Sequence, residues 1–178
     1  VEQRTKELNI KNKELFKLSI TDKLTGLYNR VKLDSVLQEN MSLSLRYGNI
    51  FSVIIIDIDF FKKINDNFGH QVGDDVLKEC SYILSQNIRN VDTLGRWGGE
   101  EFLVVCPETL KDGAKDLAIK LNKAIKLHKF STYPHSVTIS VGVASCSVND
   151  LNYDDIISNA DKALYEAKNN GRDRVEIF

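Results

Sequence analysis

The chain has 178 residues, with 24 Lys and Arg against 25 Asp and Glu side chains, so its formal net charge is −1. This balance argues against a general nucleic-acid-binding protein, which is usually basic, and the length predicts one domain with a short appendage. Apolar runs such as Val53–Ile56 are far below the roughly 18 residues of a membrane span. Cys80, Cys106 and Cys146 lack metal-ligand spacing, so we expect reduced thiols in a cytosolic protein.

Residues 1–20 differ from the rest, because they lack Gly and Pro and carry five cations against three anions. Val1, Leu8 and Leu15 recur every seven residues, a weak heptad pattern whose other core positions are polar. The start at Val1 rather than Met predicts a fragment of a longer chain. Two interpretations of this segment stay open, since it is shorter than the roughly three heptads that indicate a coiled coil. It is a helical stalk from a missing upstream domain, or a solvated helix packed on its own domain.

The rest of the chain alternates strand and helix patterns. The β-branched run 51–58 predicts a central strand buried on both faces, whereas 137–143 alternates as a half-buried strand does. Asp74 or Asp75 is the expected N-cap of the first helix, and Gly171 is expected to end the last one. The order predicts an α+β fold with a mixed sheet and helices against it. The predicted strands are 51–58, 93–96, 101–106, 137–143 and 174–178, and the predicted helices are 73–88, 114–127 and 156–167.

Two acidic clusters lie at the ends of neighbouring predicted strands. Residues 57–59 leave the first strand, and Glu100 and Glu101 follow the Gly98–Gly99 turn, where we expect glycine to allow a positive φ. Carboxylates from separate strands cannot easily both ionise unless a cation lies between them, and Mg²⁺ prefers such oxygen ligands. Either cluster alone is more typical of a strand end or a solvated turn, but together they favour a metal site.

The stretch Gly98-Gly99-Glu100-Glu101-Phe102 resembles the signature of the GGDEF family of diguanylate cyclases, in a GGEEF form. The signature alone would be weak, but four further stretches lie where that family has its motifs. Five motifs in the right order are specific, and the resemblance covers about residues 21–178. The other stretches are DKLTGLYNR at 22–30, DIDFFKKIND at 57–66, FGHQVGD at 68–74 and KNNGR at 168–172.

The resemblance implies a palm-like nucleotidyl cyclase fold, with a central mixed, mostly antiparallel sheet. It also implies an enzyme that joins two GTP molecules into cyclic di-GMP and releases two pyrophosphates. By similarity, Asp57, Glu100, Glu101 and the carbonyl of Ile58 hold a pair of Mg²⁺ ions, with Mn²⁺ as an alternative. Glu100, with Glu101, is also the candidate for deprotonating the ribose 3′-hydroxyl.

The resemblance further implies the substrate contacts. Asn65 and Asp74 match the family's guanine readers, and an amide and a carboxylate complement the guanine edge. Lys62 matches a phosphate contact and transition-state stabiliser. Plain structural roles stay open for some of the others, such as a turn for His70 and a helix-dipole cation for Lys168. Phe60 and Phe61 are more typical, as a pair, of the core and of the scaffold of the phosphate loop. The remaining substrate positions are His70, Phe60, Phe61, Gly98, Gly99, Lys168 and Arg172.

Arg89 and Asp92 match the family's R-x-x-D inhibitory site, which binds the product, although a helix-end Arg and a turn Asp would look the same. Because one chain holds one GTP, the resemblance also implies a homodimer of facing half-sites. We expect a cytoplasmic domain whose parent protein could be membrane-anchored, under an upstream sensor domain, and no nucleic-acid partner.

Two other functions stay open from the sequence. One is a catalytically idle module that binds GTP or cyclic di-GMP, but such relatives usually lose the signature acids, which are present here. The other is a palm-type cyclase acting on a single ATP or GTP. The pairing of Asn65 with Asp74, and the presence of Arg89 and Asp92, disfavour it.

Overall fold

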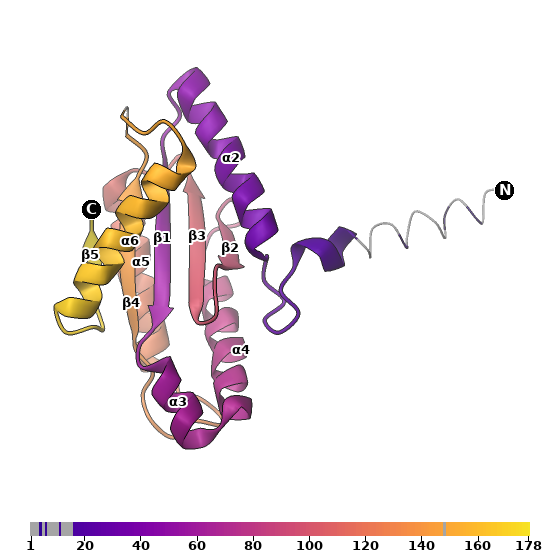
Figure 1. The fold of residues 1–178 in the computed structure, drawn as a ribbon, viewed down its shortest axis with the longest axis vertical. Coiled ribbons are helices and arrows are strands. Elements are labelled where there is room, and N and C mark those ends of the chain that lie inside the picture. The colour runs from indigo at the N-terminus through magenta and orange to yellow at the C-terminus, as the bar shows by residue number, and fades with distance from the viewer. Residues whose placement is uncertain (1–3, 5, 7–10, 12–15, 148) are drawn as a thin grey trace.

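The computed structural model describes residues 4, 6, 11, 16–147 and 149–178. In this part, five strands form one sheet in the order β2-β3-β1-β4-β5, with helices on both faces (Figure 1). All neighbouring strands are antiparallel except β4 and β5. The predicted α+β fold with a mixed, mostly antiparallel sheet is therefore confirmed. The elements are α2 (Arg30–Tyr47), β1 (Phe51–Ile58), α3 (Phe61–Phe68), α4 (His70–Asn87), β2 (Thr93–Arg96), β3 (Glu101–Pro107), α5 (Lys111–Leu127), β4 (Ile139–Ser145), α6 (Tyr153–Asn169) and β5 (Val175–Ile177).

Strand β1 lies at the centre of the sheet, and every one of its residues is buried. Its side chains alternate between two cores, as a pleated strand requires. Ile54 and Ile56 pack with residues of α4 and α5, whereas Val53 and Ile55 pack with residues of α2 and α6. The prediction of a strand buried on both faces is confirmed, and the two cores fix helices on each side of the sheet.

Strand β4 is buried too, which corrects the prediction of a half-buried strand at 137–143. Helix α5 packs on one side of it and α6 on the other. A Cβ on Gly142 would overlap the carbonyl oxygen of Ala160, so glycine is needed where α6 crosses the strand. Ser140 is fully buried and its hydroxyl donates to a carboxylate, so its polarity does not mark a solvent face.

Helix α4 begins at His70, so Asp74 and Asp75 lie inside the helix and not at its N-cap as predicted. The preceding residue, Gly69, has a φ of 86°, a left-handed value that glycine adopts without strain. This turn sends the chain directly from α3 into α4. Helix α6 ends as predicted, because Gly171 follows its C-cap residue with a φ of 112°. Helices α2 and α3 are additions to the predicted elements.

Residues 16–20 form a helical segment beside the N-terminal end of α2 (Figure 1). The backbone and side-chain nitrogens of Asn29 donate to the carbonyl oxygens of Ile20 and Ser19, at 2.9 and 2.8 Å. Asn29 also caps α2, so one residue ties this segment to the domain. Among the described helices, none is long and apolar enough to cross a bilayer. The heptad residues of the proposed stalk lie outside the described residues: Val1, Leu8 and Leu15.

The cysteines are free thiols, in agreement with the prediction. Cys80 and Cys106 are buried in the core, and Cys146 is half-buried. Burial raises the pKa of the Cys106 thiol to about 12, with a smaller increase from the charge of Asp92. A thiol with such a pKa is almost wholly protonated at neutral pH, so it packs as a small apolar side chain.

Candidate active site

Three acidic residues meet where β1 ends and β3 begins. Asp57 and Glu101 are partners across the antiparallel strands, so their side chains leave the sheet on the same face. The N–H of Ile58 donates to the carbonyl oxygen of Glu100 at 3.3 Å, which brings Glu100 beside the same strand end. Burial and then the charge of Asp57 raise the pKa of both Glu100 and Glu101. The structure thus places these acids where they repel one another in a poorly solvated corner.

Lys168 lies directly against this acidic corner. Its Nζ is 2.8 Å from Oδ2 of Asp57, whose side chain is only 8% exposed. Burial raises the pKa of Asp57, and the hydrogen bond and charge of Lys168 oppose that rise. Lys168 stands in the last turn of α6, so the packing of α6 on β4 and β1 brings this cation to the acids. Its position is more specific than an interaction with the helix dipole requires.

Asp59 does not join the acidic corner, which corrects the interpretation of residues 57–59 as one cluster. Its Oδ1 accepts the Ser140 hydroxyl at 2.6 Å, and its Oδ2 accepts the Thr138 hydroxyl at 2.7 Å. The N–H of Asp173 donates to the same Oδ2 at 3.1 Å. Asp59 therefore uses its carboxylate to hold β4 and the loop after α6.

The acidic corner offers oxygen donors alone, which suit a hard cation such as Mg²⁺. These donors are the carboxylates of Asp57, Glu100 and Glu101 and the carbonyl of Ile58. In the part of the chain that the structure describes, no three carboxylate, imidazole or thiol groups are arranged to hold a metal by themselves. That is compatible with Mg²⁺, which usually takes one or two protein carboxylates and completes its shell with waters and substrate phosphates.

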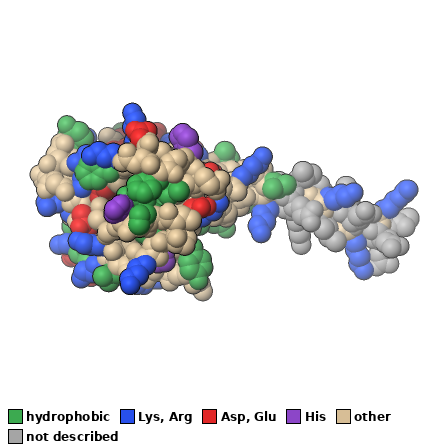
Figure 2. All heavy atoms as spheres, turned by 90° about the horizontal axis from the view of Figure 1, so that it is seen from below, with side chains coloured by type: hydrophobic (Ala, Val, Ile, Leu, Met, Phe, Trp, Pro, Cys, Tyr) green, Lys and Arg blue, Asp and Glu red, His purple; other side chains and the backbone are tan. Residues whose placement is uncertain are grey.

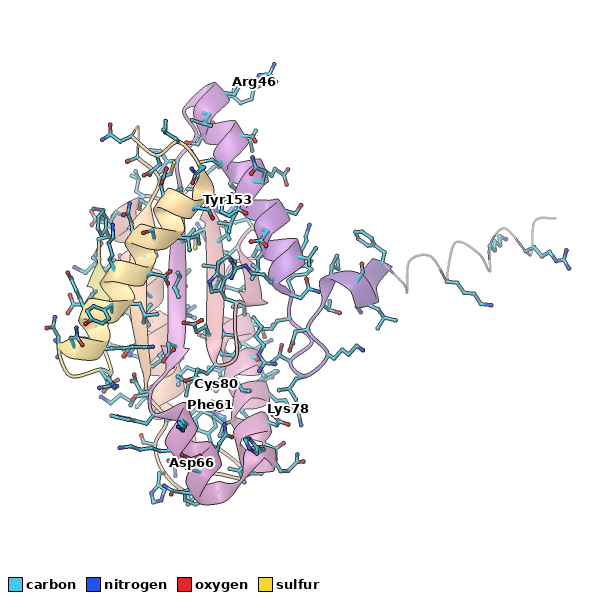
Figure 3. All side chains as sticks on the ribbon, viewed as in Figure 1. Arg46, Phe61, Asp66, Lys78, Cys80 and Tyr153 are labelled. Atoms are coloured by element: carbon cyan, nitrogen blue, oxygen red, sulfur yellow. The ribbon has the colours of Figure 1, made fainter. Side chains whose placement is uncertain are left out.

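Basic side chains flank the N-terminal end of α3. The guanidinium carbon of Arg172 lies 4.6 Å from the ring centroid of Phe60, the residue before the helix. Lys62 is exposed in the first turn of α3. The unpaired N–H groups of a helix N-terminus favour an anion, so this end of α3 suits phosphate. Phe61 instead packs in the core with Cys80 of α4 (Figure 3), which supports the scaffold role for this residue.

Four residues of this region have unusual backbone angles. Phe60, Arg172 and Asp173 have φ values of 56°, 64° and 48°, and Gly171 has 112°. A left-handed conformation costs a residue other than glycine about 1–2 kcal/mol. Such strain persists only where the surroundings impose it, and it is frequent at binding sites.

The α3–α4 turn brings together the candidate guanine readers. A Cβ on Gly73 would overlap Oδ1 of Asn65, so the glycine lets the Asn65 side chain lie against the first turn of α4. Asp74 follows in the same turn and is half-buried, while His70 is exposed at the start of the helix. An amide and a carboxylate therefore lie at the same end of the domain, as recognition of a guanine edge requires.

An aromatic cluster supports this end of the domain. The ring centroids of Phe68, at the end of α3, and Tyr133 are 5.1 Å apart, and His135 packs against both rings. Figure 2 shows hydrophobic and histidine side chains side by side on this end of the molecule, with Lys and Arg around them. The loop between α5 and β4 thereby supports the helix that carries Lys62 and Asn65.

The glycines of the signature turn do not have positive φ values, which corrects the expectation for Gly98 and Gly99. A Cβ on Gly98 would approach Oε2 of Glu101 to 2.8 Å, so this glycine makes room for a site carboxylate. The Arg96 side chain holds the Gly98–Gly99 turn in place through hydrogen bonds. Its Nη2 and Nε donate to the carbonyl oxygen of Gly99 at 2.6 and 3.1 Å, and its Nη1 lies 3.3 Å from the carboxylate of Asp22.

The stretch 22–30 braces the same turn, a role that sequence reasoning missed. The guanidinium carbon of Arg30 lies 3.2 Å from the Trp97 ring centroid. The carbonyl oxygen of Tyr28 accepts the N–H of Arg96 at 2.8 Å. The only signal in the sequence was the presence of the stretch itself, since its partners lie about seventy residues further along the chain.

Arg89 and Asp92 bind each other. Nη2 of Arg89 lies 2.8 Å from Oδ1 of Asp92, and its Nε lies 3.1 Å from Oδ2. The Thr109 hydroxyl also accepts from Arg89, at 2.6 Å. The Asp92 side chain is fully buried, whereas that of Arg89 is 54% exposed. The pair therefore closes the turn after α4 and leaves the arginine accessible.

Comparison with known proteins gives consistent relatives. The family model described as "Diguanylate cyclase, GGDEF domain" matches residues 19–174. Response regulator PleD of Caulobacter vibrioides is 39% identical over 163 residues, which cover 89% of this chain and 36% of that protein. Diguanylate cyclase A of Treponema denticola is 38% identical over 173 residues, which cover 94% of this chain and 47% of that protein. This chain thus spans less than half the length of these two relatives.

Solved structures share the fold. The coiled coil and GGDEF domain of DgcB from Caulobacter crescentus, solved in complex with c-di-GMP, has a TM-score of 0.92 at 25% identity, over 99% of this chain and 95% of that one. The active GGEEF domain of a diguanylate cyclase from Vibrio cholerae has a TM-score of 0.80 at 37% identity, over 84% of this chain and 96% of that one. These similarities confirm the palm-like fold expected from the sequence.

Proposed function

The chain belongs to the GGDEF family of diguanylate cyclases, and on that premise we propose that it condenses two GTP molecules into cyclic di-GMP with release of two pyrophosphates. The observation that carries the proposal is the acidic corner of Asp57, Glu100 and Glu101, with Lys168 bound to one of its acids. A buried and two half-buried acids that repel one another, beside a cation, suit a metal-bound triphosphate.

We assign the metal site to Asp57, Glu100, Glu101 and the carbonyl of Ile58. A pair of Mg²⁺ ions, or Mn²⁺ in their place, would lower the pKa of the ribose 3′-hydroxyl and neutralise the pyrophosphate leaving group. The raised pKa values of the three acids support the assignment, because a divalent cation removes the repulsion that causes part of the rise.

Glu100, assisted by Glu101, accepts the proton of the attacking 3′-hydroxyl in this proposal. A carboxylate held within hydrogen-bond reach of the hydroxyl can accept its proton as a general base. Lys62, Lys168 and Arg172 bind the triphosphate, and Lys62 stabilises the charge that develops in the transition state. The backbone N–H groups that follow Phe60 add neutral donors at the start of α3.

Asn65 and Asp74 select guanine. The Asp74 carboxylate accepts from N1–H and N2–H₂ of the base, and the Asn65 amide donates to N3 or accepts from N2–H₂. The Asn65 side chain lies against Gly73, the residue before Asp74, and this supports these roles. His70 lies at the same turn and is exposed to a bound nucleotide.

Two copies of the chain have to meet, because each supplies one substrate site and the product contains two nucleotides. Residues 1–20 serve as a stalk that raises the effective concentration of one site for the other, under control of an upstream sensor domain. Arg89 and Asp92 form the proposed inhibitory site for the product, in which the accessible Arg89 contacts the product and the buried Asp92 holds Arg89 in place. The exposure of Arg89 supports this role, since an arginine fork suits both phosphate and guanine.

Incubation of the purified protein with GTP and Mg²⁺ tests the proposal, with the products separated by chromatography and identified by mass. Cyclic di-GMP is the expected product, and none is expected when a chelator replaces the metal. GTP binding without any product would instead show an idle binding module. A cyclic mononucleotide would show a different palm-type cyclase.

A further inference from the structure

The loop after α6, residues 170–174, carries a phosphate-site arginine in a strained conformation. Gly171, Arg172 and Asp173 are consecutive residues with left-handed φ values. Glycine adopts this conformation freely, but an arginine and an aspartate do so only when the surroundings hold them. The contacts of the loop therefore show which residues impose the position of Arg172.

Arg172 itself donates from its N–H to the carbonyl oxygen of Ala167 at 3.0 Å and from Nη1 to that of Lys168 at 3.4 Å. Asp173 makes the contacts of the loop with α5. Its Oδ2 lies 2.5 Å from Nζ of Lys126, and its Oδ1 lies 3.4 Å from Nδ2 of Asn122, both on α5. The Asn122 amide also donates to the carbonyl oxygen of Ile139 at 2.9 Å, which fixes it against β4. The backbone N–H of Asp173 donates to Asp59 at 3.1 Å. Asp173 is thus held by Asp59, which follows β1, and by two residues of α5.

Asp59 links the loop to the other side of the phosphate site. It is buried, and the Thr138 and Ser140 hydroxyls hold its carboxylate. Phe60 follows Asp59 in the chain, and Arg172 precedes Asp173. The hydrogen bond between Asp59 and Asp173 therefore sets the distance between Phe60 and Arg172, whose ring and guanidinium lie 4.6 Å apart.

We propose that Asp173, clamped by Lys126 and Asn122 of α5, is a positioning residue that holds the Arg172 guanidinium over the Phe60 ring for the distal phosphates of the substrate. The inference rests on the proposed function for the identity of the substrate. A guanidinium that is already in place loses less freedom when it binds phosphate, so the clamp raises affinity without touching the ligand.

A purely structural role for Asp173 would be to join α6 to β5. Breaking such a link would lower the stability of the protein and reduce its affinity for every ligand by the same factor. The positioning role predicts a selective effect, in which affinity falls only for ligands that reach Arg172. Binding of α,β-methylene GTP, which has the distal phosphates, is therefore compared with binding of GMP, which lacks them.

Two variants remove the clamp in different ways. Asp173→Gly deletes the carboxylate but keeps the backbone N–H and tolerates the left-handed angle. Lys126→Met leaves the loop sequence intact, and Lys123→Met is its matched control, an exposed lysine on the same helix. We expect roughly three- to tenfold weaker binding of α,β-methylene GTP for Asp173→Gly and Lys126→Met, with GMP affinity unchanged. The proposed clamp would be overturned if both ligands lost affinity equally, or if neither variant lost affinity for α,β-methylene GTP.

Nuclear magnetic resonance gives a readout that needs no nucleotide. The Phe60 ring shifts the side-chain signals of Arg172, and Phe60→Leu gives the unshifted reference. In Asp173→Gly we expect those signals to move toward the reference, while Lys123→Met leaves them in place. If they move as expected but the unaltered protein binds no GTP analogue, the proposed function fails and the clamp stands. If the analogue binds and the signals of Asp173→Gly stay shifted, the clamp fails alone.

Discussion

Nη2 and Nε of Arg96 both donate to the carbonyl oxygen of Gly99, at 2.6 and 3.1 Å. The same guanidinium reaches the carboxylate of Asp22 from its third nitrogen. Asp22 is itself held by the N–H and hydroxyl of Thr25, at 2.9 and 2.7 Å. A motif near the start of the domain therefore fixes the turn that precedes Glu100 and Glu101.

Replacing Arg96 with Met is expected to reduce cyclic di-GMP formation roughly tenfold, because a loosened turn misplaces the acids by fractions of an ångström. Initial rates of product formation at saturating GTP give the measurement. Arg46→Met, at the exposed end of α2, is the matched control. Equal rates for the two variants would contradict the role of Arg96.

Glu100→Gln is expected to lower turnover by at least about a hundredfold, because the amide can neither accept the hydroxyl proton nor offer a charged oxygen to a metal. The change preserves shape at a residue outside the core, so melting temperature should not fall. Glu39→Gln, an exposed residue of α2, is the control. Substantial turnover by Glu100→Gln would rule out the assigned role.

The raised pKa values of Glu100 and Glu101 predict how stability depends on pH without metal. Each group has an ordinary value of 4.5 and a higher one in the folded state, because of burial and the charge of Asp57. The folded state then binds more protons than the unfolded chain. Its extra stability is complete below pH 4.5 and is lost as pH rises through the folded-state pKa.

Glu100→Gln removes one of these groups, so its melting temperature should fall less steeply than that of the unaltered protein as pH rises above 4.5. The comparison is made in a chelator by scanning calorimetry. Mg²⁺ at neutral pH should stabilise the unaltered protein more than the variant. Parallel pH curves would show that Glu100 ionises normally.

Arg89→Ala is expected to raise the concentration of cyclic di-GMP that halves the rate, since the accessible arginine is the main contact offered to the product. Inhibition is measured relative to each variant's own uninhibited rate. The change also removes side-chain partners of the buried Asp92, so a stability loss of about 1–3 kcal/mol is expected. Unchanged inhibition would show that the product binds elsewhere.

Removal of residues 1–18 is expected to lower the rate per chain at low protein concentration, because two copies then meet only by diffusion. At high concentration the shortened and full-length chains should converge. A concentration series of both chains gives the test. Equal rates throughout would show that pairing does not depend on this segment.

The two strands β1 and β3 could be predicted because each contains a compact run of apolar residues. Two helices escaped prediction for opposite reasons. Helix α3 is short and buries only Phe61 and Ile64. Helix α2 exposes Val31 and Leu45, so its apolar residues do not follow one helical face. In both cases tertiary packing outweighs the local pattern.

Predictions for the site depended on whether the relevant contact was local. The motifs indicated Asp57, Glu100 and Asn65, and the structure brings their segments to one end of the domain. Asp59 looked equivalent to Asp57, because nothing in the local sequence reveals that the Thr138 and Ser140 hydroxyls donate to its carboxylate. Arg96 and Asp173 also support the site through contacts with segments that are distant in the sequence, so only the folded chain shows these contacts.

The acidic side and the phosphate side of the site differ in how firmly the fold holds them. Asp57 lies on a strand whose backbone is paired with β3 and with β4, whereas Arg172 lies on a loop tied mainly through side chains. Amide protons of β1 should therefore exchange with solvent only through global unfolding, and those of residues 170–174 through local opening. In mild denaturant, residues 170–174 would then unfold locally before the sheet does. Activity would disappear while the acidic corner and the sheet remain intact.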